Sequence, residues 1–330
     1  VEQDQLSQEF QLSGQVGDVS YIAGLFYYNE SAKTVNPYQF GSPTGPFIVR
    51  NFYGVDSEAF ALFGQAEWAA TDQLSISLGL RWTEEEKDFS ISHPDDFVAP
   101  FTTSANNSWE NFSPSLSVSY AWSDQLNSYL RIARGWKSGG FNGESENLTV
   151  AETPYNEEEV TSYEIGIKSL LLDNRLQLNA ALFQNNTTDM QLSEFLGASG
   201  SSQITNAGEA TVTGFELELV AAASDELTLH ANYGYLDAKY DKFISYGVDV
   251  KASALFPYSP ENTWSIGAQY SRQALSARID YSFVDTHDLY YDQASAATTS
   301  VSDYNLLNAR ISWDVAAANN ADADFGHRTL

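Results

Sequence analysis

Apolar and polar residues alternate along much of this chain, and a period of two leaves little room for helices. Segment 71–82 (TDQLSISLGLRW) shows the pattern clearly. One set of alternate positions carries Leu74, Ile76, Leu78, Leu80 and Trp82, and the other carries Ser75, Ser77, Gly79 and Arg81. The segment therefore predicts a β-strand with one apolar and one polar face. The apolar face can meet either a protein core or lipid.

The alternation recurs in about 13 segments, which are joined by two kinds of connection. Short turns precede leucines that recur about every 50 residues, one hairpin per repeat; these are Leu74, Leu126, Leu176, Leu227 and Leu275. The other connections are long and polar, at about 33–56, 90–108, 138–156 and 242–260. Short turns on one side and long loops on the other are typical of an outer-membrane β-barrel.

We therefore predict an all-β fold, an antiparallel transmembrane β-barrel with strands of roughly 12–15 residues. Tryptophans support it by falling in two predicted girdles: Trp68, Trp122 and Trp313 towards the short turns, and Trp82, Trp109, Trp136 and Trp264 towards the long loops. A soluble β-sandwich or propeller also shows alternation and is the alternative.

Charge and composition exclude several classes. The net charge of −28 over 330 residues argues against nucleic acid as a partner. The absence of cysteine excludes disulfides and thiolate chemistry. No apolar run approaches the roughly 18 residues of a transmembrane helix. Because residue 1 is Val, we expect a processed or truncated chain.

Four segments carry a resemblance to a known family. The run RIARGWKSGGFN (131–142) is similar to a strand-to-loop segment of TonB-dependent outer-membrane receptors. Segments 159–183, 206–220 and 304–313 also resemble the family and follow its order. The resemblance implies a barrel of roughly 22 strands closed by an N-terminal plug. It also implies uptake of a ferric siderophore or similar scarce nutrient, driven by the TonB complex through the plug.

On this resemblance, residues 1–330 are a single barrel domain, a fragment without plug and terminal strands. About 13 strands of the larger barrel should then form a curved antiparallel sheet whose first and last strands are unpaired. The expected location is the outer membrane of a Gram-negative bacterium, among lipid and lipopolysaccharide, and the expected state is a monomer.

Two glutamates match family segments in which carboxylates pair with plug arginines. Glu164 lies in SYEIG and Glu216 in GFELE, and alternation places both on the polar, lumen face. Alternatively, each is a lumen carboxylate solvated by water.

Ligand contacts in the family come from the long loops and the lumen mouth, often through aromatic and basic residues. Eight candidates follow from this resemblance: Tyr38, Phe40, Trp136, Lys137, Phe141, Tyr155, Tyr290 and Tyr291. The aromatic members can equally pack the loops against one another.

Catalytic or metal chemistry finds little support, so we predict no enzyme, catalytic residue, metal site or cofactor. His93 with Asp95 and Asp96 is a weak metal candidate, and a solvated loop is the simpler interpretation. His230 and Asn232 share the lumen face, as an outer-membrane hydrolase with a Ser-His-Asn set would require. Acidic loop residues from Glu144 onward keep the surface soluble or bind cations that bridge lipopolysaccharide.

Three functions remain distinguishable. The first is a TonB-dependent receptor, which binds and releases its ligand without covalent chemistry. The second is a passive porin-like channel, which needs no plug. The third is a surface enzyme or adhesin.

Overall fold

The computed structural model describes residues 1–40, 47–94, 100–196, 201–245, 247–291 and 300–315. Strands dominate it: β1 (Glu2–Val16), β2 (Val19–Phe40), β3 (Phe47–Ala69), β4 (Leu74–His93), β5 (Phe101–Ser123), β6 (Leu126–Lys137), β7 (Glu158–Leu171), β8 (Leu176–Leu196), β9 (Ser201–Ala222), β10 (Leu227–Ser245), β11 (Val248–Asp249), β12 (Asn262–Arg272), β13 (Leu275–Val284) and β14 (Tyr304–Trp313). One short helix, α1 (Leu148–Glu152), lies between β6 and β7. Within the described residues, no helix has the length and apolarity needed to cross a membrane.

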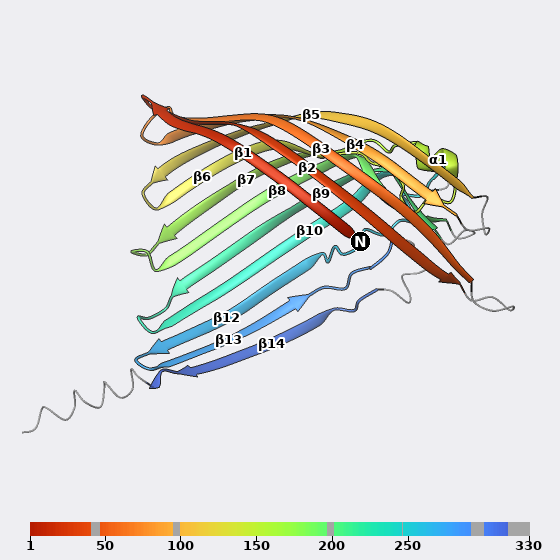
Figure 1. Cartoon of the computed structure of the whole chain (residues 1–330). Coiled ribbons are helices and arrows are strands. Elements are labelled where there is room, and N and C mark those ends of the chain that lie inside the picture. Colours follow the sequence, from red (N-terminus) through yellow and green to blue (C-terminus); the bar gives the residue numbers. More distant parts are fainter. Residues whose placement is uncertain (41–46, 95–99, 197–200, 246, 292–299, 316–330) are drawn as a thin grey trace, which may run out of the picture.

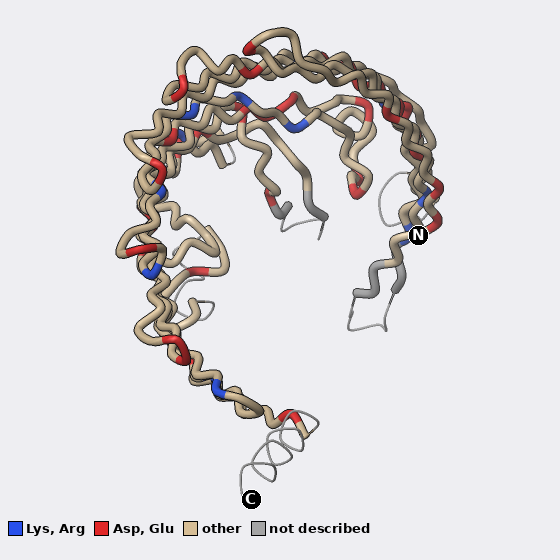
Figure 2. Tube along the Cα trace, turned by 90° about the vertical axis from the view of Figure 1, so that its left-hand side faces the viewer, with Lys and Arg blue, Asp and Glu red and all other residues tan. Residues whose placement is uncertain are grey.

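The strands form one continuous antiparallel sheet. Apart from β11, which pairs only with β10, they lie side by side in chain order from β1 to β14 (Figure 1). In the tube view the sheet curves into an arc that is open on one side (Figure 2). Among the described residues, β1 pairs only with β2 and β14 only with β13. The predicted open, curved sheet is therefore confirmed.

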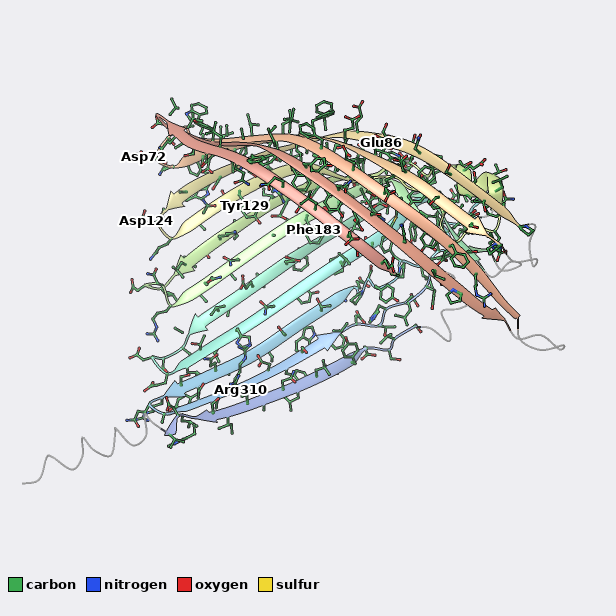
Figure 3. The ribbon with its side chains drawn as sticks, in the orientation of Figure 1. Asp72, Glu86, Asp124, Tyr129, Phe183 and Arg310 are labelled. Carbon is green, nitrogen blue, oxygen red and sulfur yellow. The ribbon has the colours of Figure 1, made fainter. Side chains whose placement is uncertain are left out.

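The repeated leucines mark strand starts as predicted. Leu74, Leu126, Leu176, Leu227 and Leu275 begin β4, β6, β8, β10 and β13. Each follows a tight turn, and two of these turns carry Asp72 and Asp124 at one end of the sheet (Figure 3). Hydroxyl side chains help close such turns: the Thr71 Oγ1 accepts a hydrogen bond of 2.9 Å from the Leu74 amide. The longer connections lie at the opposite end (Figure 1).

Strand lengths vary more than the predicted 12–15 residues: β1, β6 and β7 fall within that range, β12 to β14 have 10 or 11 residues, and β3 and β5 each span 23. On the long strand β4 the extra length goes with a change of polarity along the strand. On β4 the outward positions change from apolar, up to Trp82, to acidic at Glu84, Glu86 and Asp88. The inward positions become apolar at Phe89 and Ile91, which are each only 2% exposed. The pairing of β4 with its neighbours continues through this change, although the apolar side chains move from the outer to the inner face.

The outward apolar positions form what we call the apolar belt. On β4 it comprises Leu74, Ile76, Leu78, Leu80 and Trp82, and register extends it across neighbouring strands. On β8 to β10 the belt residues nearest the long-loop end are Leu182, Phe215 and Tyr235. The next outward-facing residues towards that end are polar: Gln184, Thr213 and Asp237. The belt therefore ends at a common level on several strands.

Trp109 does not belong to the predicted outer girdle. The pairing of Trp109 with Glu85 places it on the same face as Lys87 and Phe89, the inner face. It is 4% exposed and meets Phe141 edge to face, with ring centroids 6.2 Å apart. Its position is odd-numbered, whereas the outward residues of β5, such as Phe112, are even-numbered, so the alternation itself argued against the assignment.

Candidate functional site

The concave face of the sheet forms the wall of a lumen, and its polar side chains are the candidate binding surface. Glu164 on β7 accepts a 2.7 Å hydrogen bond from the Tyr129 hydroxyl on β6. The Tyr129 ring lies over Gly166, where an added Cβ would come within 2.6 Å of a ring carbon. A glycine is therefore needed for this tyrosine to reach the carboxylate.

Glu216 lies two strands away on the same wall. Its register partners are Ala181 on β8 and Gly234 on β10, so small residues flank it on both sides. The Phe183 ring lies over Gly214, close to where a Cβ would be (Figure 3). Within the part of the chain described, neither Glu164 nor Glu216 forms an ion pair. Two carboxylates on one wall are thus available to cationic groups entering the lumen.

A cluster of three polar side chains on the same wall was not predicted from the sequence. His230 Nε2 lies 2.7 Å from Asp280 Oδ1, and Arg278 Nε donates to Asp280 Oδ2 at 2.7 Å. The contact spans strand β12 above Gly267, whose Cβ-free position leaves room for the imidazole. Alternation placed these residues on the lumen face, but only the strand register brings them together.

The arrangement of His230 does not assemble the hydrolase set considered above. Asn232 donates to the Ser265 hydroxyl at 3.1 Å, whereas His230 contacts Asp280 and Arg278. The geometry is that of a polar network on a barrel wall.

The segment 138–157 between β6 and β7, which we call the strap, crosses the concave face near the long-loop end. Lys87 Nζ on β4 donates to the Ser138 hydroxyl and the Gly139 carbonyl, both at 2.7 Å. Phe141 stacks on Phe89, with ring centroids 5.1 Å apart. The strap therefore joins the β4 side of the wall through polar and apolar contacts.

The other end of the strap is bound to β9. The Asn142 side chain donates to the Ile204 carbonyl at 3.2 Å and accepts from the Ile204 amide at 2.6 Å. Asn206 Nδ2 donates to the Asn156 carbonyl at 2.9 Å. Because β4 and β9 are five strands apart in the sheet, the strap closes part of the lumen mouth.

A pocket of about 310 Å³ lies between α1 and β9, and none of its lining residues is charged. It includes Thr149, Thr153 and Tyr155 on the strap side and Gln203 and Asn206 on β9. The Tyr155 backbone exchanges hydrogen bonds with Gly140, 2.9 and 3.2 Å long, which holds the ring in place. The Tyr155 hydroxyl is protonated at neutral pH, as in any tyrosine, and burial raises its pKa further.

The other predicted ligand contacts occupy varied positions. Phe141 packs the strap onto the wall, and Tyr291 packs on Phe243 with centroids 4.8 Å apart. Tyr290 is 57% exposed in the β13–β14 connection. Tyr38 and Phe40 belong to β2, and their side chains lie outside the described residues.

Two further candidates for ligand contacts, Trp136 and Lys137, are neighbours at the end of β6. Lys137 pairs with Glu158 and follows the inner-face register. Trp136 pairs with Glu159 and shares the parity of Leu130 and Ile132, which is that of the outer face. The register therefore places Trp136 on the opposite face of β6 from Lys137. Its register partner Glu159 accepts a 2.6 Å hydrogen bond from the Asn111 side chain of β5.

Metal-binding candidates are sparse. His93 is fully buried and stacks on Phe101 with centroids 5.8 Å apart, while Asp95 and Asp96 lie outside the described residues. Among the residues that the structure does describe, no three His, Cys, Asp or Glu side chains converge as a metal site.

A second aromatic cluster at the lumen mouth was missed. Tyr240 stacks on Phe256 at 4.7 Å and meets Phe243 at 4.8 Å. Burial, with a smaller contribution from Tyr291, raises the pKa of Tyr240 to about 12. The cluster fastens the segment after β10 to the wall. No single periodic pattern marks it, because Tyr240 and Phe243 lie on β10 whereas Phe256 and Tyr291 come from separate connections.

Together these features define a class: an antiparallel barrel wall with an apolar outer belt and a polar lumen, its mouth narrowed by a docked strap. The family model for the β-barrel of TonB-dependent receptor-like proteins matches residues 2–326. The chain therefore belongs to the TonB-dependent receptor family.

Relatives and solved structures agree with this membership. The pesticin receptor of Yersinia enterocolitica is 30% identical over 205 residues, which are 62% of this chain and 29% of that protein. The probable TonB-dependent siderophore receptor PiuA of Acinetobacter baumannii is 28% identical over 52% of this chain and 23% of that protein. The chain thus spans less than a third of the length of either relative.

The fold is similar to the ferric yersiniabactin uptake receptor FyuA of Yersinia pestis. The TM-score is 0.79 at 22% identity, covering 94% of this chain and 46% of that one. The siderophore receptor PiuA of Acinetobacter baumannii gives a TM-score of 0.73 at 18% identity, covering 95% of this chain and 50% of that one. These are receptors for transport, and the family is not one of enzymes.

Proposed function

We propose that this chain forms the barrel wall of an outer-membrane receptor in a Gram-negative bacterium. The receptor takes up a ferric siderophore or similar scarce nutrient, using energy from the TonB complex. Family membership and the similarity to a pesticin receptor and a probable siderophore receptor support this. We expect a monomer, because such a barrel closes by pairing strands of one chain.

The observation that carries the proposal is the wall with its two available carboxylates. Both lie on the concave face: the register partners of Glu216 are Ala181 and Gly234, and those of Glu164 are Arg131 and Phe183. Neither carboxylate forms an ion pair within the described residues. We propose that plug arginines pair with both, so that the wall holds a plug that TonB can move. Water around each carboxylate is the competing interpretation.

The test is energised uptake. A strain carrying the intact parent gene should accumulate an iron-loaded siderophore from a panel, and a protonophore should abolish that accumulation. Deletion of the gene should remove the uptake of at least one ligand. Unchanged uptake of every panel member would contradict the proposal, and steady open-channel conductance in planar bilayers would favour the passive porin-like alternative.

The Tyr155 pocket is our proposed ligand contact. Its uncharged lining combines hydroxyl and amide groups with the apolar side chains of Val150, Pro154 and Ile204, which suits a neutral part of a ligand rather than an ionic one. Five further residues remain proposed ligand contacts outside this pocket: Trp136, Lys137, Tyr290, Tyr38 and Phe40.

Tyr155→Phe should weaken ligand binding by roughly threefold to tenfold, the worth of one neutral hydrogen bond. Fluorescence titration of the intact receptor with the ligand that it takes up measures the dissociation constant. Tyr258→Phe is the matched control, because Tyr258 is 70% exposed and outside the pocket. Equal affinities for the wild type and Tyr155→Phe would remove this hydroxyl from the site.

A further inference from the structure

The convex face carries a hollow within the apolar belt. Its volume is about 660 Å³, within the range of roughly 300–1,000 Å³ common for ligand sites. Small residues form its floor: Ala23 on β2 is the register partner of Gly64 on β3. An added Cβ at Gly64 would meet only the Ile22 carbonyl oxygen, at 3.7 Å. No described side chain therefore fills the space above Gly64.

Large apolar side chains form the walls of this hollow: Phe10, Leu12, Leu25, Leu62, Leu80 and Trp82. Phe10 and Leu12 are each 66% exposed, and Leu80 is 51% exposed. Within the described residues no other element covers this face, because strands β1–β5 form a single layer here (Figure 1). The hollow thus suits an acyl chain, which removes apolar surface from water.

Acidic side chains lie directly above the hollow, at the edge of the belt. Register places like charges opposite one another in three pairs: Glu84 with Glu110, Glu58 with Glu86, and Asp56 with Asp88. Glu86 projects from the convex side (Figure 3). We call these six residues the acidic ladder. Like charges directly opposite are destabilising, and none of the described ion pairs involves a ladder residue.

We propose that the hollow binds one acyl chain of a phosphorylated, multiply acylated glycolipid of the outer leaflet. Divalent cations between the acidic ladder and the lipid phosphates complete the contact. The ladder does not chelate a cation alone, since no three described carboxylates converge on one point. The cation therefore needs the lipid phosphate, and the lipid needs the hollow for its placement. The inference rests on the proposed outer-membrane location but not on uptake.

The test uses the intact receptor in nanodiscs that contain lipid A and phosphatidylglycerol, with native mass spectrometry to count retained lipids. Lipid A should be retained in magnesium and released by EDTA, and phosphatidylglycerol should not compete. Gly64→Phe fills the hollow and should lower lipid A retention about tenfold. Glu84→Gln combined with Glu110→Gln should lower retention and its dependence on magnesium.

The matched control is Ala180→Phe, which adds the same ring to the belt on β8, beside Leu217 and Ile167. It should retain lipid A like the wild type. Circular dichroism of each variant confirms that the sheet has formed. Equal retention by Gly64→Phe and the wild type, or retention that EDTA does not change, would overturn the proposal. If the wild-type receptor retained lipid A in magnesium but its gene supported no uptake of any ligand in the panel, that result would count against the proposed function alone.

Discussion

Replacing Glu164 and Glu216 together by glutamine is expected to lower energised uptake by roughly tenfold or more. In the proposed receptor each carboxylate faces a plug arginine, and removal of one partner of a buried pair costs about 3–5 kcal/mol because the other charge stays uncompensated. Exposure to lumen water reduces this cost, which is why we expect the lower end. The measurement is the initial rate of siderophore-iron accumulation with and without protonophore.

Asp225→Asn is the matched control for that experiment. It makes the same carboxylate-to-amide change in the exposed turn between β9 and β10, away from the lumen wall. The double variant should also admit large antibiotics that the wild type excludes, because a loosened plug leaks. Normal uptake and no leak in the double variant would support the solvated interpretation of both glutamates.

Phe89→Ala is expected to destabilise the docked strap by about 3–5 kcal/mol, the usual cost of removing a buried phenyl ring. Phe89 is 2% exposed, stacks on Phe141 and packs against Ala151 of α1. Hydrogen exchange of amides within 138–157 measures the effect locally, and their protection should fall well before that of the β4 and β5 ladders.

Phe112→Ala provides the comparison for Phe89→Ala. The same ring is lost from the outer face, where Phe112 is 56% exposed and does not contact the strap. Strap amides should keep their protection in this variant. If Phe89→Ala left the strap protected as in the wild type, the polar ties at Lys87 and Asn142 would be sufficient to hold it.

The local pattern alone determined where strands begin and which face of them is apolar. Leu74 and its counterparts start strands because each directly follows a tight turn and opens an alternating segment. A shift of the strand by one residue would exchange its apolar and polar faces, so the pattern fixes the register. The positions of Glu164 and Glu216 on the lumen face followed from the same rule.

Only the tertiary structure decided which distant residues meet. Register between β10, β12 and β13 brings His230 to Asp280 across Gly267, and no local signal encodes a contact over 50 positions. The strap likewise turned Trp109, Phe89 and Phe141 into a small core beyond the belt. An alternating pattern describes one strand at a time. Burial at the lumen mouth depends on the strap that crosses it, so only the curved sheet with its docked strap determines these contacts.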